Sequence, residues 1–500
     1  GLIGLWATYN TTNYAAYDAA MGVVARSLDT FVGLTAKGPA TVTNDASVGA
    51  QINAEGTEGF IMLAGEPNSS LKSLMQNSDW ASTLAMTNKT FFVNDLMIAS
   101  GKQDLTVGSD ENEGLVTPLN AGGTLTLINQ SSNRLTLNAS VTNNTSASQV
   151  AKLGSGLVKL TGRNTYTGTT SMNEGELEFS GGSTQTLVGA ISGAGSLVKS
   201  GSGILTLSAF NTYTGPTVIK EGIVVAQNTR AFGTPDTGTV VISGATLDVG
   251  GSLAANTLYL SNEVFTVSGK GVGEQGAIVN NSANSQQNAF GKIVLAGDTW
   301  FGGAQRWDIR QNTPTLIMNG YDITKISTNT IVFTYTDVQP DGEGGTGDID
   351  LKSGTLILDN TIKLNGSAVN TMTVRGGAQL QMYSMAAANP ALWTLILENL
   401  STISAGNGSS GGTVNHWAGP VILTNGTAFL TGANTAYSET FSGEISGPGS
   451  LVKTGVAVAY LNGTNNTYEG SAIVSNGTLY AKCAGALPGY ATGKVSVVSG

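Results

Sequence analysis

The sequence predicts an all-β protein, a right-handed parallel β-helix (solenoid) of about 20 coils that forms an elongated rod. Composition is the first observation behind this prediction, because 68 of the 500 residues are Gly and only 11% are charged. A chain rich in Gly, Ser, Thr and Asn disfavours helix interiors and suits short strands with tight turns. The second is a long internal repeat, and the third is a two-residue alternation in segments such as GLVKLTG and GGTLTLIN. A series of β-sandwiches is the alternative, but it favours more regular strands and clearer hairpin turns.

One pentapeptide recurs along the chain. NTYTG occupies residues 164–168 and 211–215, and NTYEG occupies residues 466–470. Two of the copies begin with the frame I-S-G-x-G-S-L-V-K, at Ile191 and Ile445. The lysine of the frame precedes the asparagine of the motif by 12, 12 and 13 residues, in the pairs Lys152 and Asn164, Lys199 and Asn211, and Lys453 and Asn466. This self-similarity, with strands ending every 20 to 25 residues or so, is typical of stacked coils.

Each residue type in the pentapeptide suits a corner of a solenoid. Asn tolerates a left-handed backbone and can pair its amide with an Asn of the next coil, Tyr offers a flat apolar ring, and Gly closes the corner. A second Gly follows seven residues later in every copy, at Gly175, Gly222 and Gly477, in E-G or N-G pairs that suit a turn with positive φ. We therefore expect the motif to be structural, with a ligand site as the alternative.

The extended frame ISGxGSLVKxGxGxLxLxxxNTYTGxTxIxxGxLxx resembles a known family. It is similar to the autotransporter-associated β-strand repeat, also called the passenger-associated transport repeat, of large bacterial exported proteins. The copies from Ile191 and Ile445 carry nearly the whole pattern, whereas the copy from Lys152 lacks its lead. The segments LWATYNTTNYAAYD and RWDIR also resemble parts of such proteins. The resemblance implies an exported β-helix and an extracellular or cell-surface location, and it leaves the ligand open.

The repeats divide the chain into four regions. Residues 1–150 are predicted to form an N-terminal β-helical region with a candidate capping segment at 13–31, where a helix competes with strands. Residues 151–260 hold two repeat copies, residues 261–430 form a less regular β-helix with a loop at 337–350, and residues 431–500 hold the third copy. The sequence starts without Met and stops within a predicted coil, so we expect a mature or excised piece that continues beyond residue 500.

Charge and cysteine content exclude some function classes. The net charge is −10 and the pI is near 4.7, which disfavours a nucleic-acid surface. No apolar run approaches the ~20 residues of a membrane helix. Cys483 is the single cysteine, so a disulfide within the chain is impossible. We expect Cys483 to be a small buried hydrophobe rather than a reactive thiol.

Three segments contain candidate catalytic, metal-binding or sugar-binding residues. His416, the single histidine, lies beside Trp417 and is expected to be a surface or packed residue rather than a base. The acidic loop could bind calcium, but its spacing matches no known calcium loop and a solvated loop is favoured; it contains Asp341, Glu343, Asp348 and Asp350. A third segment could bind a sugar, although a strand with an outward Arg/Asp/Arg ladder and a buried Trp is favoured; it contains Asp298, Trp300, Phe301, Arg306, Trp307, Asp308 and Arg310.

The sequence therefore predicts an extracellular structural or adhesive β-solenoid, a rod or a building block of a filament or sheath, without catalysis. No residue is assigned as catalytic, cofactor-binding or metal-binding. The expected partners are further copies of the chain, end to end or side by side, or a cell surface or glycan. A β-helical protein that degrades or binds polysaccharides is the alternative, with Arg306, Asp308, Arg310 or His416 in its groove.

Overall fold

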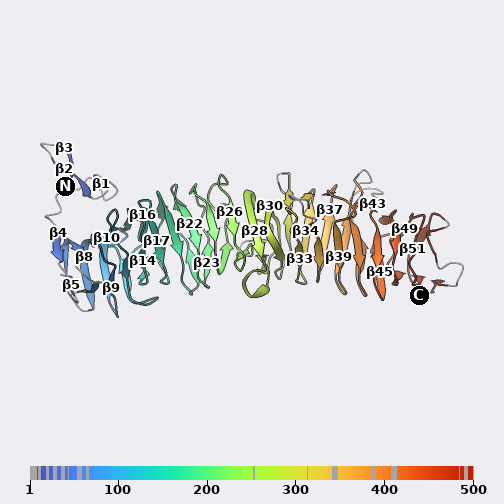
Figure 1. Ribbon diagram of the computed structural model, residues 1–500, viewed down its shortest axis with the longest axis horizontal. Helices are drawn as coiled ribbons and strands as arrows, with labels where there is room; N and C mark the ends of the chain where they lie inside the picture. Colours follow the sequence, from blue (N-terminus) through green and yellow to red (C-terminus); the bar gives the residue numbers. More distant parts are fainter. Residues whose placement is uncertain are drawn as a thin grey trace. The chain divides into compact units, whose positions relative to one another are not determined.

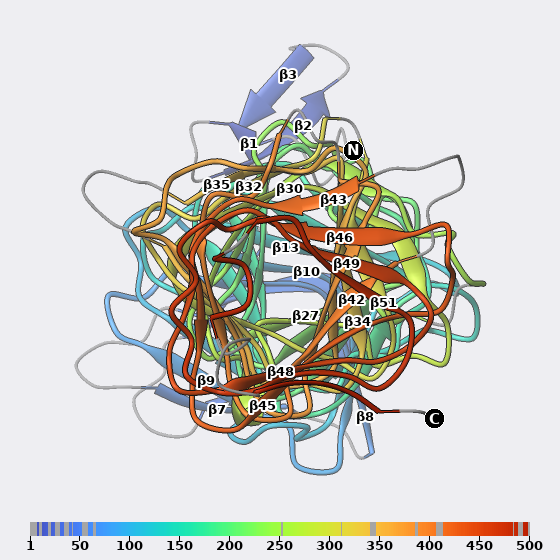
Figure 2. The ribbon, with the colours of Figure 1, turned by 90° about the vertical axis from the view of Figure 1, so that its right-hand side faces the viewer.

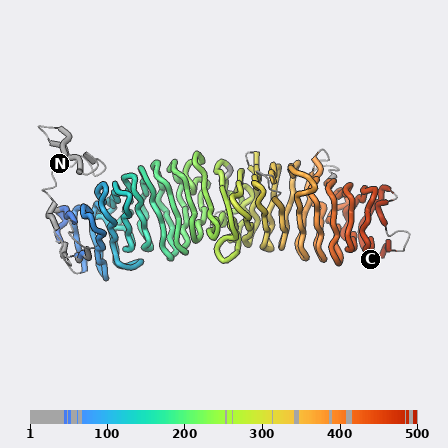
Figure 3. Tube along the Cα trace, in the orientation of Figure 1, coloured from blue at the N-terminus to red at the C-terminus, as the bar shows by residue number. Residues whose placement is uncertain are grey.

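The computed structural model describes residues 8–9, 13–18, 22–25, 31–34, 40–42, 44–52, 59–63, 67–251, 254–311, 313–340, 347–385, 389–406, 414–483, 485–488 and 494–498. The chain divides into two compact units, Gly1–Thr239 and Val240–Gly500. Within each unit the turns follow one another in chain order, as Figures 1 and 3 show.

Each unit is all-β, and its parallel strands stack as the turns of a β-solenoid, about 18 turns in all over the described residues. The predicted fold class is confirmed, and its right-handed sense stays a prediction. One 3-10 helix, η2 (Val272–Glu274), occurs among the described residues. In this part of the chain, no helix is both long and apolar enough to cross a membrane.

The first unit contains a short antiparallel segment and two sets of parallel strands. The antiparallel strands are β1 (Thr8–Tyr9), β2 (Asn13–Asp18) and β3 (Gly22–Ala25). One parallel set comprises β4 (Phe31–Leu34), β6 (Asp45–Ile52), β8 (Asn68–Gln76), β10 (Thr90–Ile98), β12 (Leu115–Thr117), β13 (Thr124–Asn129), β15 (Ser140–Val141), β16 (Gln149–Leu153), β18 (Thr170–Met172) and β21 (Ile191–Ser192). The other comprises β5 (Ala40–Val42), β7 (Gly59–Leu63), β9 (Ser82–Ala85), β11 (Leu105–Val107), β14 (Leu135–Leu137), β17 (Leu157–Leu160), β19 (Glu176–Phe179), β20 (Gln185–Leu187), β22 (Ser196–Lys199), β23 (Ile204–Leu207), β24 (Thr217–Ile219) and β25 (Ile223–Ala226).

The helix considered for residues 13–31 is not what the structure shows. Its described part forms β2, β3 and the start of β4, and β2 pairs with both β1 and β3. Tyr14 and Tyr17 favour a strand as much as the alanines favour a helix. A capping role for this segment stays a prediction.

The second unit, whose first residues include part of β26 (Thr239–Val241), also carries two parallel sets. The larger comprises β27 (Thr246–Asp248), β28 (Leu260–Gly269), β29 (Ile278–Val279), β30 (Gln286–Phe301), β31 (Trp307–Ile309), β32 (Thr315–Ile317), β33 (Ile323–Lys325), β34 (Thr330–Thr334), β35 (Asp337–Gln339), β36 (Ile349–Leu351), β37 (Thr355–Asp359), β38 (Lys363–Leu364), β39 (Thr371–Val374), β40 (Gln379–Tyr383), β41 (Thr394–Leu397), β42 (Thr402–Ala405), β44 (Val421–Leu423), β45 (Thr427–Gly432), β47 (Ile445–Ser446), β48 (Ser450–Lys453), β50 (Ala472–Val474) and β52 (Val495–Val497). The smaller sheet comprises β43 (Val414–Trp417), β46 (Ser438–Phe441), β49 (Val458–Leu461) and β51 (Thr478–Ala481), which lie one behind another in Figure 2.

Equivalent positions on successive turns form columns that run through the interior. In the first unit, Leu160 is the register partner of Phe179, Phe179 of Lys199, and Lys199 of Ile219. All four side chains are buried. Each turn therefore covers the apolar side chains of its neighbours, which no single turn could bury alone. Lys199 is the one charged member of this column.

Candidate functional site

The asparagine of the repeated motif joins three successive turns. Asn211 is buried, and its Oδ1 accepts from the backbone N–H of Ile191, 2.8 Å away on the preceding turn. Its Nδ2 donates to the carbonyl of Ala231 on the following turn at 2.7 Å. Asn466 makes the equivalent bonds, to the N–H of Ile445 and the carbonyl of Ala486.

The pairing expected between asparagine side chains of neighbouring coils is therefore wrong for these copies. The amide bonds backbone groups of the adjacent turns instead, because a corner residue faces peptide groups that have no strand partner. Asn164 follows the same plan on one side, where Oδ1 accepts from the N–H of Val141 at 3.0 Å. On its other side Nδ2 donates to Gln185 Oε1 at 3.0 Å.

The tyrosine of the motif lies inside the corner. Tyr166, Tyr213 and Tyr468 are all buried, as expected for an apolar ring. The Tyr166 hydroxyl shares a hydrogen bond of 2.8 Å with Thr170 Oγ1, and the Tyr213 hydroxyl shares one of 2.6 Å with Thr217 Oγ1.

Two glycines of each copy meet two different requirements. A Cβ on Gly168, Gly215 or Gly470 would lie within 2.3 Å of a carbonyl oxygen on the preceding turn, so close approach selects glycine there. Gly175, Gly222 and Gly477 have φ of +64°, +73° and +76°. The predicted positive-φ turns are thus confirmed, and the Asn, Tyr and Gly of the motif each meet a structural need.

The lysine that ends the I-S-G-x-G-S-L-V-K frame points inward rather than to solvent. Lys199 Nζ donates to the carbonyls of Gly201 and Glu221, at 2.5 and 3.3 Å. Lys152 bonds the carbonyls of Gly154 and Glu174, and Lys453 those of Thr454 and Gly455. Burial lowers the pKa of Lys152 and of Lys199 to about 8. Lys152 and Lys199 thus hold turn carbonyls of their own and of the following coil, and Lys453 holds those of its own turn.

The RWDIR segment forms a closed ion cluster. Asp308 is fully buried, and Arg306 donates to its two carboxylate oxygens at 2.8 and 2.7 Å. Arg310 Nη2 lies 3.1 Å from the same carboxylate. Trp307 points the other way, into the core, against Phe290 and Phe301. The ladder with a buried Trp is therefore what forms, but its Asp is covered by the two Arg side chains rather than exposed.

The two tryptophans considered for sugar binding do not form one platform. Trp307 is fully buried and donates its indole N–H to Gly302 O at 3.1 Å. Trp300 is half-buried, and its ring is approached by Lys270 Nζ at 4.7 Å and by Lys352 Nζ at 5.0 Å. A sugar ring would have to displace these cations to stack on Trp300.

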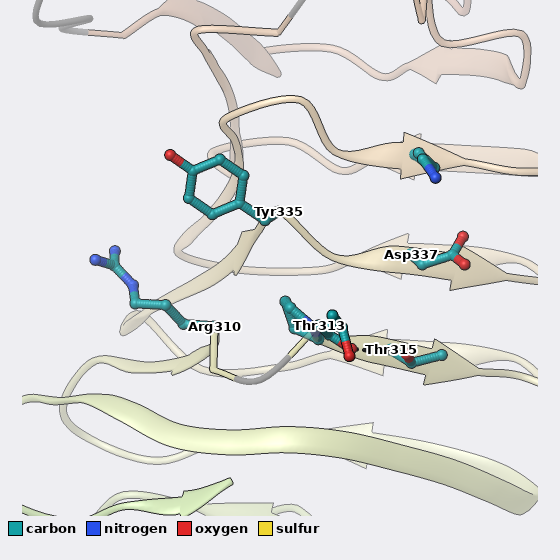
Figure 4. A pocket seen from close by; sticks show the side chains of 7 residues that line it. Arg310, Thr313, Thr315, Tyr335 and Asp337 are labelled. Carbon is teal, nitrogen blue, oxygen red and sulfur yellow. Dashed lines mark hydrogen bonds between the residues drawn. The ribbon is translucent and has the colours of Figure 1, made fainter.

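One surface concavity of the second unit lies beside Arg310 (Figure 4) and has a volume of about 440 Å³. Arg310 and Tyr335 lie on one side of the view, and Thr315 and Asp337 lie along their strands on the other. Tyr335 is 58% exposed and has φ of +54°. The polar groups are largely paired within the protein, because Arg310 binds Asp308, and Asp337 accepts from Gln339 and Asn365. The carboxylate of Asp337 and one end of the Arg310 guanidinium are therefore already engaged within the protein.

A second concavity lies on the outward face of the β43–β46–β49–β51 sheet and has a volume of about 480 Å³. We call it the Tyr460 groove; it is lined by His416, Thr435, Ala436, Tyr437, Ser438, Thr440, Val458, Tyr460, Asn462 and Lys482. Tyr460 stacks on Tyr480 with ring centroids 5.1 Å apart and an angle of 9° between the rings. Lys482 Nζ lies 4.7 Å from the centroid of Tyr460.

His416 is half-buried at the edge of this groove, where its Nε2 is 2.7 Å from Ser442 Oγ. Burial lowers the pKa of His416 below its ordinary value, which favours the neutral ring at pH 7. Arg310 and His416 line separate concavities, so the structure does not bring together the residues considered for a single enzymatic groove.

The acidic loop is only partly described, since Asp341 and Glu343 lie outside the described residues. Asp348 accepts a hydrogen bond from the backbone N–H of Thr371 at 2.6 Å, and Asp350 accepts from Arg375 at 2.8 Å. The described residues contain no group of three or more His, Cys, Asp or Glu side chains placed to hold a metal ion. Calcium binding by this loop therefore stays open.

Cys483 is less buried than the sequence suggested, with an intermediate exposure. Its thiol lies 3.1 Å from the carbonyl oxygen of Gly463 on the preceding turn. The side chain thus contacts the backbone of a neighbouring coil at the edge of the solenoid rather than the apolar core.

Sequence reasoning missed the roles of the inward lysines and of the Tyr460 groove. Sequence signals for both exist. The alternation in S-L-V-K puts Leu and Lys on one face of the strand, which predicts that the lysine points inward with the leucine. Likewise, Tyr460 and Tyr480 occupy equivalent places in VAYL and TLYA. The register between turns fixes what each side chain meets, and the sequence does not display it.

Comparison with known proteins identifies the repeat. The family described as passenger-associated-transport-repeat matches residues 150–179, 197–226 and 451–481, the same three copies that the motif marks. The chain is thus a parallel β-solenoid that carries three passenger-associated transport repeats, as the resemblance predicted.

A curated relative extends the likeness to most of the chain. It is the adhesin BmaC autotransporter of Brucella suis biovar 1 (strain 1330), which is 27% identical over 611 aligned positions. The alignment covers 97% of this chain and 17% of the relative, so the chain spans about a sixth of that protein's length. No solved structure matches this chain.

Proposed function

We propose that this chain is an extracellular segment of a bacterial surface protein, and that it holds or forms an adhesive surface without catalysing a reaction. The three passenger-associated transport repeats carry the proposal. They coincide with corners in which Asn and Lys side chains join successive turns, Tyr is buried and Gly allows close approach of the preceding turn. Residues that serve to stack turns give the chain a structural role. We therefore expect its function to depend on the surface that the stacked turns expose.

The similarity to an adhesin supports the adhesive part of the proposal. The closed ion cluster at Asp308 supports the non-catalytic part. Its carboxylate is enclosed by two guanidinium groups, so it is not positioned as a general acid or base toward a bound substrate. Self-association into a filament or sheath stays a prediction, which analytical ultracentrifugation of the purified chain would test.

The first experiment asks where the chain lies and whether it adheres. In intact cells of the bacterium that makes it, external protease should cleave the chain while a cytoplasmic protein stays whole. Beads coated with the folded chain should bind host epithelial cells more than beads coated with albumin. Protection from protease in intact cells but not in lysed ones would contradict the location, and equal binding of both kinds of beads would contradict the adhesive role.

A further inference from the structure

The outward face of the β43–β46–β49–β51 sheet carries a column of aromatic side chains that is interrupted at one turn. His416, Thr440, Tyr460 and Tyr480 are register partners on four successive turns. Tyr460 and Tyr480 stack on each other, whereas the short side chain of Thr440 separates His416 from Tyr460. His416, Thr440 and Tyr460 all line the Tyr460 groove. The missing ring therefore leaves a slot between two rings.

The width of this slot suits one inserted ring. Neighbouring parallel strands lie about 4.8 Å apart, so His416 and Tyr460, two turns apart, are separated by about 10 Å. A ring in contact with both needs about 7 to 8 Å, since carbon atoms touch at roughly 3.5 to 4 Å. A single six-membered ring can enter, whereas two stacked rings cannot. Thr440, 6% exposed, forms the floor.

The edges of the slot are polar. Asn462 lines the groove, and its Oδ1 is covered and accepts no hydrogen bond from the described residues. Thr435, Ser438 and Thr440, whose side chains carry hydroxyl groups, line the same space. An aromatic ring would leave these groups unpaired, whereas the hydroxyls of a sugar could donate to the amide oxygen and accept from the threonine and serine side chains.

The charge of the groove favours an acidic sugar. Lys482 is exposed, and no carboxylate is found among the described residues that line the groove. Glu439 lies on the same strand as Thr440 but points into the interior, where burial raises its pKa well above the ordinary value and favours the neutral form. In the unbound chain the ammonium of Lys482 lies over the Tyr460 ring, so an entering sugar has to displace it from the ring and then pairs its own carboxylate with it.

We propose that the Tyr460 groove binds one carboxylated pyranose ring of a glycan, with the ring stacked between His416 and Tyr460 and its carboxylate facing Lys482. This site would supply the ligand class of the adhesive surface, so it rests on the proposed function. Stacking of an apolar sugar face on an aromatic ring supplies the contact area, and Lys482 selects the charge.

The test measures binding of three probes to the purified 500-residue chain by titration calorimetry: 3′-sialyllactose, a hyaluronan tetrasaccharide, and lactose as the neutral match. At least one acidic probe should bind about tenfold or more tightly than lactose. Thr440→Tyr should fill the slot and weaken that binding by about tenfold or more. The matched control Thr440→Ser should bind like the natural chain, and Lys482→Met should bring the acidic probe close to lactose.

Amide exchange of β46 and β49 checks that the variants fold. We expect Thr440→Tyr to fold, because Tyr460 and Tyr480 already form a stack of this kind on neighbouring turns. Absence of binding by both acidic probes, or equal binding by Thr440→Tyr and Thr440→Ser, would overturn the site. Bead adhesion by the natural chain in that case would leave the proposed function standing. Sugar binding by a chain that is not found at the cell surface would instead support the site and contradict the proposed function.

Discussion

Tyr468 and Ala472 occupy the places where the other two copies pair a tyrosine with a threonine, and the buried Tyr468 hydroxyl has no hydrogen-bond partner among the described residues. Tyr166 bonds Thr170, and Tyr213 bonds Thr217. Alanine at position 472 cannot provide the bond. Burial raises the pKa of Tyr468 to about 12. The third copy thus contains an unsatisfied polar group that the first two avoid.

Restoring the missing hydroxyl should stabilise the third copy. We expect Ala472→Thr to raise the free energy of local opening around β50 by about 1 kcal/mol, the usual net value of a buried hydrogen bond. Tyr468→Phe should be neutral or slightly stabilising, because it removes the unpaired group. Tyr213→Phe should lower local stability by about 1 kcal/mol, since it leaves Thr217 unpaired. Hydrogen exchange read by mass spectrometry measures each effect, and a loss of protection in Tyr468→Phe equal to that in Tyr213→Phe would contradict the account.

The buried Lys199 should contribute more to the free energy of local opening than an exposed lysine does. Lys199→Met keeps the length of the side chain but leaves the carbonyls of Gly201 and Glu221 without their ammonium donor. We expect the free energy of local opening to fall by about 2 kcal/mol. Lys220→Met is the matched control, because Lys220 is half-exposed and reaches Glu176 only at 3.4 Å; its effect should be about 0.5 kcal/mol or less. Equal effects of the two variants would contradict the role assigned to Lys199.

The corner asparagine should protect a particular amide on another turn. Asn211→Leu removes the acceptor of the Ile191 N–H and the donor to the Ala231 carbonyl, both buried groups. We expect a loss of about 2 to 4 kcal/mol in local stability, because two backbone groups lose their partners. Exchange of the Ile191 amide should speed up more than that of amides on the strand of residue 211's own turn. Asn173→Leu serves as the control, because Asn173 is exposed and its side chain makes no hydrogen bond among the described residues.

Asp95 should make the first unit less stable as the pH rises. This carboxyl is buried in β10, and burial raises its pKa from 3.8 to about 7, although Thr126 and the charge of Lys72 oppose the shift. The folded chain therefore binds this proton more tightly than the unfolded chain. The stabilising contribution is complete below about pH 4 and is lost as the pH rises through 7, a change of about 4 kcal/mol at most.

Denaturant unfolding followed in the first unit at pH 4 to 8 measures this dependence. Asp95→Asn should flatten it, since the amide does not titrate. A pH dependence that is the same in Asp95→Asn and in the natural chain would show that other groups control it.

The periodic parts of the fold were predictable because the physical signal lies within the sequence. Alternation in residues 157–160 and 204–207 gives strands with one buried face, and the glycines of E-G and N-G pairs give positive φ. Asn211 and Lys199 were placed correctly as recurring positions, but their partners are backbone groups one turn away. No property of the residue itself names such a partner, because the length of each turn sets the register between coils.

The groove shows the same limit. Tyr460 and Tyr480 are ordinary strand residues in the sequence, and they become a stack only because 20 residues make one full turn there. His416 was expected to be packed or exposed, and it lies between these, at the edge of a hollow. Arg306, Asp308 and Arg310 were close enough in sequence to suggest their cluster, whereas burial of the Asp depends on packing that the sequence does not display.

The reach of Asn211 to both neighbouring turns has a consequence for how such a chain assembles its structure. The hydrogen bonds of a turn that carries this asparagine are complete only when the following turn has folded against it. Each turn that folds therefore stabilises the preceding turn as well as itself. Folding that propagates from one nucleus is then favoured over nucleation at many separate turns. Local unfolding should spread in the same way. Unfolding of one turn should destabilise the two adjacent turns, and turns further away should be affected only if those two also unfold.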